Sequence, residues 1–182
     1  MIQQPAPERR YVEAALRAFA RRGFFGTTMN HIGDEAGVSQ PRISQVFDGK
    51  ESAYLAAHEI ARDAIAQSFR DTAGDTFDPV GTGLRFRELL ATRPEVVMMV
   101  LHTGSAAYSV PAIAEAGQLA WNQLTAVLLE ECSATPEQAR DFLGRGMIVM
   151  MLEAMTGGRP VEGLDSLNSL LGVLRSSPAP AA

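Results

Sequence analysis

A short segment near the N-terminus groups side chains that can hydrogen-bond the edges of nucleic-acid bases. The helix predicted over residues 39–47 begins at Ser39 and has an outward polar face of Gln40, Arg42, Ser44 and Gln45. Its opposite face is apolar and consists of Ile43, Val46 and Phe47. Amide and guanidinium groups pair with base edges in the major groove, and hydroxyl groups bind bases or phosphates. These residue types and their spacing predict a helix that reads DNA.

The neighbouring helices add groups that suit phosphate. Thr28 and Lys50 stand at predicted helix starts, where free backbone N–H groups, a hydroxyl and an ammonium face outward. The predicted DNA contacts are therefore Thr28, Ser39, Gln40, Arg42, Ser44, Gln45 and Lys50, helped by Arg9 or Arg10. The alternative is a plain three-helix packing motif with a polar surface.

Three predicted helices over about 8–22, 28–36 and 39–47 form a helix-turn-helix pattern that would position these groups. The first has apolar residues at the i, i+3, i+4 and i+7 spacing of an amphipathic helix. Ala36-Gly37-Val38 fits the turn, because a small residue allows close approach, glycine adopts the turn conformation and valine enters the core.

The rest of the chain also predicts helices, so the expected fold class is all-α with about nine helices. Beyond the first three, the helices are expected over about 50–72, 83–92, 94–108, 111–132, 136–156 and 163–175. Residues 74–83 read as the clearest loop, and residues 176–182 as a disordered tail. The predicted division is a DNA-binding domain over 1–50 and a ligand-binding and dimerisation domain over 51–175.

Charge is unevenly distributed along the 182 residues, although the net charge of −5 at first argues against a nucleic-acid partner. Residues 1–50 carry seven basic and five acidic side chains, a net charge of +2, and the remainder carries −7. The only lysine is Lys50. The charge pattern therefore places a DNA-binding surface in the first quarter of the chain.

Composition excludes several other classes of protein. A single cysteine, Cys132, excludes a disulfide framework and a cysteine-based zinc site and fits a reducing cytoplasm. No signal peptide and no apolar run long enough for a membrane span are expected. His31, His58 and His102 lack metal-ligand spacing, so neither a metal nor another cofactor is predicted.

The first ~55 residues resemble the DNA-binding domain of the TetR family of transcriptional regulators. The resemblance rests on the segments AALRAFARRGFFGTTMNHIGDEAGVS and RISQVFDGKESAYLAA. It implies a homodimeric regulator, more often a repressor, whose divergent C-terminal bundle binds a small molecule that controls DNA affinity. Against the family pattern, Ser44 stands where Tyr is usual and Val46 where His is common, which puts part of the phosphate contact in doubt. Gly33 replaces the usual Ala and should loosen its helix by up to about 1 kcal/mol.

The C-terminal region offers candidates for a ligand pocket and a dimer interface. A pocket for an unidentified, apolar molecule is predicted around Phe86, Met98, Met99, His102, Tyr108 and Trp121. These residues could equally be ordinary core. Two apolar helices near the C-terminus predict an interface that includes Met147, Met150, Met151, Leu167, Leu170, Leu171 and Leu174. A buried monomer core is the alternative to that interface.

Enzymatic chemistry finds little support in the sequence. Thr103-Gly104-Ser105 lacks the second glycine of a nucleophile elbow, and Gly81-Thr82-Gly83 lacks the remainder of a phosphate loop. A helical-bundle enzyme that uses His102, and a protein-interaction module without DNA binding, are the two rival readings.

Overall fold

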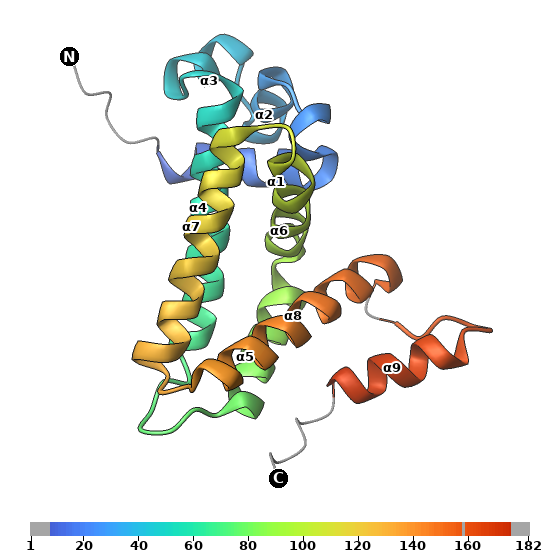
Figure 1. Ribbon diagram of the computed structural model, residues 1–182. Helices are drawn as coiled ribbons and strands as arrows, with labels where there is room; N and C mark the ends of the chain where they lie inside the picture. The colour runs from blue at the N-terminus through green and yellow to red at the C-terminus, as the bar shows by residue number, and fades with distance from the viewer. Residues whose placement is uncertain (1–7, 158, 176–182) are drawn as a thin grey trace. The chain divides into compact units, whose positions relative to one another are not determined.

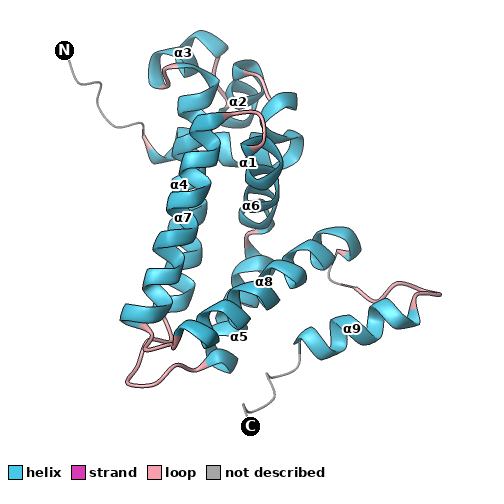
Figure 2. Cartoon of the chain, viewed as in Figure 1, coloured by secondary structure: helices cyan, strands magenta, loops and turns pink. Residues whose placement is uncertain are grey.

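The computed structural model describes residues 8–157 and 159–175, and within these ranges the chain is built from helices and loops (Figure 2). In chain order the helices are α1 (Arg9–Gly26), α2 (Met29–Ala36), α3 (Gln40–Val46), α4 (Gly49–Arg70), α5 (Pro79–Thr92), α6 (Pro94–Ala107), α7 (Pro111–Ala126) with its π-helical end η1 (Val127–Glu131), α8 (Pro136–Thr156) and α9 (Asp165–Arg175). The predicted all-α fold is confirmed. No helix among the described residues is long and apolar enough to cross a membrane.

The described residues form two compact units. The first contains residues up to 64 together with 95–121, and the second contains 65–94 together with the described residues from 122 onward. The chain passes from one unit to the other inside α4, at the start of α6 and inside α7 (Figure 1). The domain boundary predicted between residues 50 and 51 lies at the start of α4, within the first unit.

The core of the first unit forms around the apolar face of α1. Leu16 and Phe19 are fully buried, and the Phe19 ring meets the edge of Tyr54 from α4 at 4.9 Å between centroids. Ile32 from α2 and Ile43 from α3 are also fully buried. The helix-turn-helix thus presents its apolar side to this core and leaves its polar side exposed.

The first helix continues four residues past its predicted end, to Gly26. Gly23 adopts φ 65° and ψ 179°, which kinks α1 without ending it. The buried hydroxyl of Thr27 donates to the carbonyl oxygens of Ala18 and Gly23, at 3.2 and 2.7 Å. Glycine adopts a positive φ without steric cost, so it permits a bend where the sequence pattern suggested a stop.

The fifth helix begins earlier than predicted, because a local cap starts it inside the expected loop. The Asp78 carboxylate accepts from the backbone N–H groups of Val80 and Gly81, at 3.1 and 2.9 Å. Pro79 occupies the first helical position, where a missing N–H costs nothing. Phe86 of this helix and Phe142 of α8 both pack on Phe69 of α4, at 5.9 and 5.4 Å between ring centroids.

The glycine at position 33 allows the helix-turn-helix to close tightly. A Cβ there would lie 2.8 Å from the Val38 carbonyl oxygen and 3.4 Å from the Gln40 nitrogen. Both are backbone atoms, so the start of α3 would have to move. Glycine at this position therefore lowers helix propensity, but the space left by the missing Cβ is needed for the turn.

We expect Gly33→Ala to destabilise the protein by about 1–3 kcal/mol, since overpacking outweighs the gain of about 1 kcal/mol in helix propensity. The measurement is the free energy of unfolding in denaturant at one fixed protein concentration. Gly104→Ala is the control, because its Cβ meets nothing within 4 Å and it is exposed on α6. Stabilisation of both variants by a similar amount would contradict this account of Gly33.

Candidate nucleic-acid interface

The N-terminus of α2 is fixed by a reciprocal pair of hydrogen bonds. The Thr28 hydroxyl accepts from the His31 backbone N–H at 3.3 Å, and His31 Nδ1 accepts from the Thr28 N–H at 3.2 Å. Capping boxes usually have Glu or Gln at the third position, so no sequence pattern indicates this role of His31. Thr28 remains exposed at the predicted helix start.

The turn between α2 and α3 sets the direction of the polar helix. Gly37 adopts the left-handed conformation, with φ 69° and ψ 29°, and its N–H donates to the Asp34 carbonyl oxygen at 3.3 Å. The Val38 N–H donates to the Gly33 carbonyl oxygen at 3.0 Å. This geometry agrees with the role predicted for Gly37, whereas Val38, which is predicted to enter the core, is only half-buried.

The third helix is buried on one side and exposed on the other. Ile43 and Phe47 anchor it in the core. The residues predicted to contact DNA on this element are all exposed, namely Ser39, Gln40, Arg42, Ser44 and Gln45. Two pairs of these side chains already hydrogen-bond one another: Gln40 Nε2 to the Ser44 hydroxyl at 3.2 Å, and Arg42 Nη1 to Gln45 Oε1 at 3.3 Å.

A buried tyrosine positions Arg42, and the sequence analysis did not identify it. Arg42 Nε donates to the Tyr11 hydroxyl at 3.3 Å, and this bond raises the pKa of Arg42 above its ordinary value. Arg10 donates to the same hydroxyl at 2.8 Å and stacks over the Tyr11 ring at 4.5 Å. The Tyr11 hydroxyl therefore accepts hydrogen bonds from Arg10 and Arg42, two guanidinium groups that are far apart in the sequence.

The remaining basic side chains near the N-terminus divide into two groups. Lys50 lies over the Phe24 ring, with its ammonium 4.4 Å from the ring centroid, a favourable cation–π arrangement. In contrast, Arg17 and Arg21 both pair with Glu35. Arg9 and Arg10 also pair with carboxylates, those of Glu13 and Glu8. The positive charge of residues 1–50 is thus partly neutralised on α1, whereas Arg42 feels the Glu8 carboxylate only as a weaker attraction that helps to raise its pKa.

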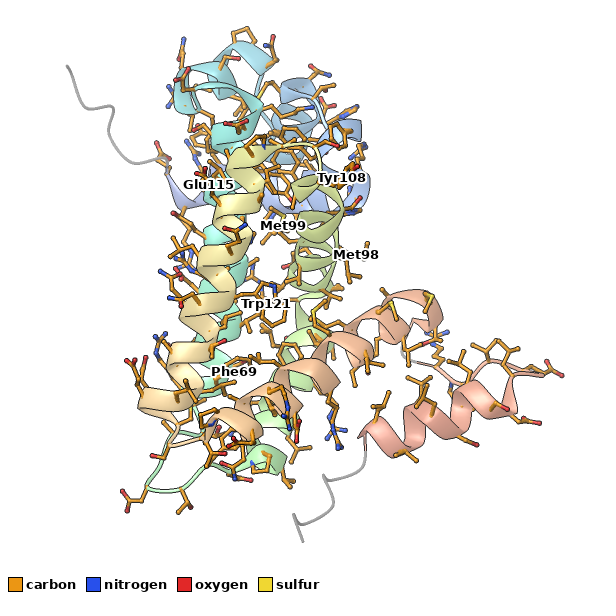
Figure 3. All side chains as sticks on the ribbon, in the orientation of Figure 1. Phe69, Met98, Met99, Tyr108, Glu115 and Trp121 are labelled. Carbon is orange, nitrogen blue, oxygen red and sulfur yellow. The ribbon has the colours of Figure 1, made fainter. Side chains whose placement is uncertain are left out.

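The candidate ligand residues occupy different environments. In the first unit, Met99 is fully buried, Met98 and His102 are half-buried, and the Tyr108 side chain is 96% exposed. Figure 3 shows Met98 and Met99 on α6, Trp121 on α7 and Tyr108 at the turn between these helices. Phe86 belongs to the second unit, where it is buried against Phe69. That these residues form a pocket stays a prediction.

His102 and its neighbour connect α6 to the DNA-binding helices. His102 Nε2 lies 3.2 Å from the Ala20 carbonyl oxygen at the kink of α1, and it donates to that oxygen. The Thr103 hydroxyl lies 3.0 Å from the Tyr54 hydroxyl of α4. Consecutive residues of α6 thus hydrogen-bond two helices of the N-terminal region.

The candidate dimer residues lie on two helices that pack together, α8 and α9. Met150 and Leu171 are buried within the single chain, and Met147, Leu167 and Leu174 are half-buried. Met151 and Leu170 are 48% and 46% exposed. The same helices and the segment between them expose four more large apolar side chains: Ile148, Met155, Leu164 and Val173.

The described part of the chain holds no group of three His, Cys, Asp or Glu side chains that could bind a metal ion. Cys132 is buried in the second unit, and its thiol lies 3.5 Å from the Phe69 carbonyl oxygen. Burial raises the pKa of this thiol, which keeps it protonated and unreactive.

Comparisons with known proteins agree with this arrangement. Residues 12–57 match the family model of bacterial regulatory proteins, tetR family. No curated protein matches the chain. The fatty acid degradation regulator FadR from Bacillus halodurans is 16% identical with a TM-score of 0.65, and the match covers 95% of each chain.

Two further solved structures show the same fold. The multidrug binding protein EbrR, complexed with imidazole, is 19% identical with a TM-score of 0.62, over 93% of this chain and 90% of that one. A TetR family regulator from Marinobacter aquaeolei VT8 is 22% identical with a TM-score of 0.59, over 91% of each chain. Residues 12–57, which contain the helix-turn-helix, thus match the DNA-binding region of the tetR family, and the whole chain shares the fold of these solved regulators.

Proposed function

We propose that the chain is a homodimeric, ligand-responsive repressor that acts in the cytoplasm and leaves its operator when a small molecule binds. The observation that carries this proposal is the exposed polar face of α3, anchored by Ile43 and positioned through the bond between Arg42 and Tyr11. In this proposal residues 1–50 bind DNA, and residues 51–175 dimerise and bind the ligand.

The third helix would enter the major groove with its polar face toward the bases. The pairs Gln40–Ser44 and Arg42–Gln45 would exchange their mutual hydrogen bonds for bonds to base edges. Lys50 and the N-terminus of α2 at Thr28 would contact phosphates. The short Ser44 side chain and the apolar Val46 leave most of the base and phosphate contacts of this helix to Arg42 and the two glutamines.

The exposed apolar side chains of α8 and α9 support a dimer formed through these two helices. Large apolar side chains that a single chain leaves exposed on two packed helices commonly mark an interface. Two copies of the N-terminal domain would then reach successive major grooves, about 34–36 Å apart.

Ligand control is supported by the contacts of α6 within the first unit. His102 and Thr103 hydrogen-bond α1 and α4, so a ligand that displaces α6 would move or break these bonds. The relative EbrR has been solved with imidazole and with proflavin, two small molecules, which supports a small-molecule site in this chain as well. The ligand would favour a conformation whose recognition helices no longer match the operator.

A gel shift with DNA from upstream of the protein's own gene tests the proposal. We expect a specific complex whose affinity falls steeply with salt concentration, because phosphate contacts release counterions. Unrelated DNA of equal length is the control. A protein-interaction module without DNA binding is the alternative, and binding to neither duplex would favour it. Equal binding to both duplexes would contradict recognition of a specific operator.

A further inference from the structure

One histidine of α4 is buried without a hydrogen-bond partner. The His58 side chain is only 6% exposed, yet no group of the described residues hydrogen-bonds its imidazole. The fully buried polar side-chain atoms of the described residues all have partners. Since His58 has no such partner, its ring nitrogens still reach solvent although the side chain is mostly buried, and they remain accessible to another molecule.

A mostly buried arginine lies one helical turn further along α4. The Arg62 side chain is 19% exposed, and its Nε and Nη2 both donate to one oxygen of Asp63, at 3.0 and 2.7 Å. The guanidinium carries five N–H donors, so most of its capacity has no protein acceptor within the described ranges. Burial and the nearby Arg62 charge lower the pKa of His58, and its imidazole is therefore neutral and able to donate one N–H.

These two side chains continue the face of α4 that contacts α6. Tyr54 hydrogen-bonds Thr103 of α6, and His58 follows Tyr54 by four residues, one turn along the same face. The helices α4 and α6 run in opposite directions (Figure 1), so the residue of α6 one turn before Thr103, the fully buried Met99, belongs to the layer of His58. The unused imidazole thus lies beside apolar surface.

We propose, on the basis of the ligand response proposed above, that His58 and Arg62 bind the carboxylate of an amphipathic organic acid. The carboxylate would accept hydrogen bonds from the imidazole and from the free guanidinium N–H groups. The apolar part of the acid would lie along α6 at Met99. The nearby carboxylates of Glu59 and Asp63 are exposed. In the Arg62–Asp63 pair the guanidinium is the more buried member, with 19% of its side chain exposed against 69%, so this place favours an anion over a cation.

Three probes of equal chain length test this selectivity: decanoate, decanol and decylammonium. Their affinities are measured by calorimetry on the full-length protein, with the fluorescence of Trp121, the only tryptophan, as a second readout. We expect decanoate to bind about tenfold or more tightly than decanol, because a charge-assisted hydrogen bond is stronger than a neutral one. Decylammonium should bind most weakly.

Variants then assign the selectivity to these side chains. Arg62→Gln and, independently, His58→Leu should remove the preference for decanoate and leave the affinity for decanol unchanged, with Arg62→Lys intermediate. Arg140→Gln is the matched control, because Arg140 is exposed on α8 and pairs with the following Asp141 as Arg62 pairs with Asp63. Thermal unfolding of each variant identifies any that fails to fold, and the other substitution then carries the test.

The proposal is overturned if decanoate and decanol bind equally, if decylammonium binds best, if none of the three binds, or if folded Arg62→Gln retains the preference. The gel shift with upstream DNA, run on the same samples, separates this result from the wider function. Specific DNA binding without a preference for the acid would refute the acid site alone. Loss of specific DNA binding in the unaltered protein would refute the regulator itself.

Discussion

Arg42→Ala is expected to reduce the affinity for operator DNA by roughly 30-fold or more, the largest effect of any single side chain on the interface. A base-contacting arginine contributes about 1–3 kcal/mol, and a homodimer loses that contribution at both half-sites. Tyr11 holds the guanidinium at the exposed face of α3, so the side chain is already positioned before DNA binds. The measurement is a salt-controlled titration of labelled upstream DNA by fluorescence anisotropy.

Arg140→Ala provides the control, since it removes an arginine that is exposed on α8, away from the helix-turn-helix sequence. Lys50→Ala should weaken binding less and nearly equally for different sequences, because a phosphate contact carries no sequence information. Unchanged affinity in both Arg42→Ala and Lys50→Ala would contradict the assignment of α3 and the start of α4 to DNA contact.

Met151→Glu is expected to convert the dimer to monomers, with a dissociation constant raised by about 100-fold or more. The side chain is 48% exposed in the single chain, so the carboxylate remains solvated in the folded monomer. In the proposed dimer it would be buried twice without a partner, and removing an unpaired charge from water costs several kcal/mol. Sedimentation at micromolar concentration should show the 19.6 kDa monomer.

Leu84→Glu is the matched control, because Leu84 is exposed to a similar degree on α5 of the same unit. It should leave the dimer intact. The monomeric Met151→Glu variant should also bind operator DNA poorly, since a monomer has one recognition helix and contacts only one half-site. Sedimentation of the unaltered protein as a 19.6 kDa species alone would contradict the dimer itself.

The start of α5 is encoded by a local signal in the sequence. Asp78 followed by Pro79 is a local helix-start signal, with a capping carboxylate and a proline in the first turn. The glycines at 81 and 83 outweighed it and favoured a loop. The kink at Gly23 is different, because α1 continues to residue 26 through contacts made by Thr27 and His102 rather than through a local pattern.

The order of the helices, the turn at Gly37 and the polar face of α3 can be predicted from the local sequence. These follow from apolar spacing, caps and glycine conformation, which depend on residues within one or two helical turns of each other. Three other features arise only when the helices pack: Tyr11 holds Arg42, Glu35 pairs with Arg17 and Arg21, and His58 is mostly buried without a protein partner. Each of these depends on residues brought together by packing between helices, and the periodicity of a single helix does not specify which residues of another helix it meets.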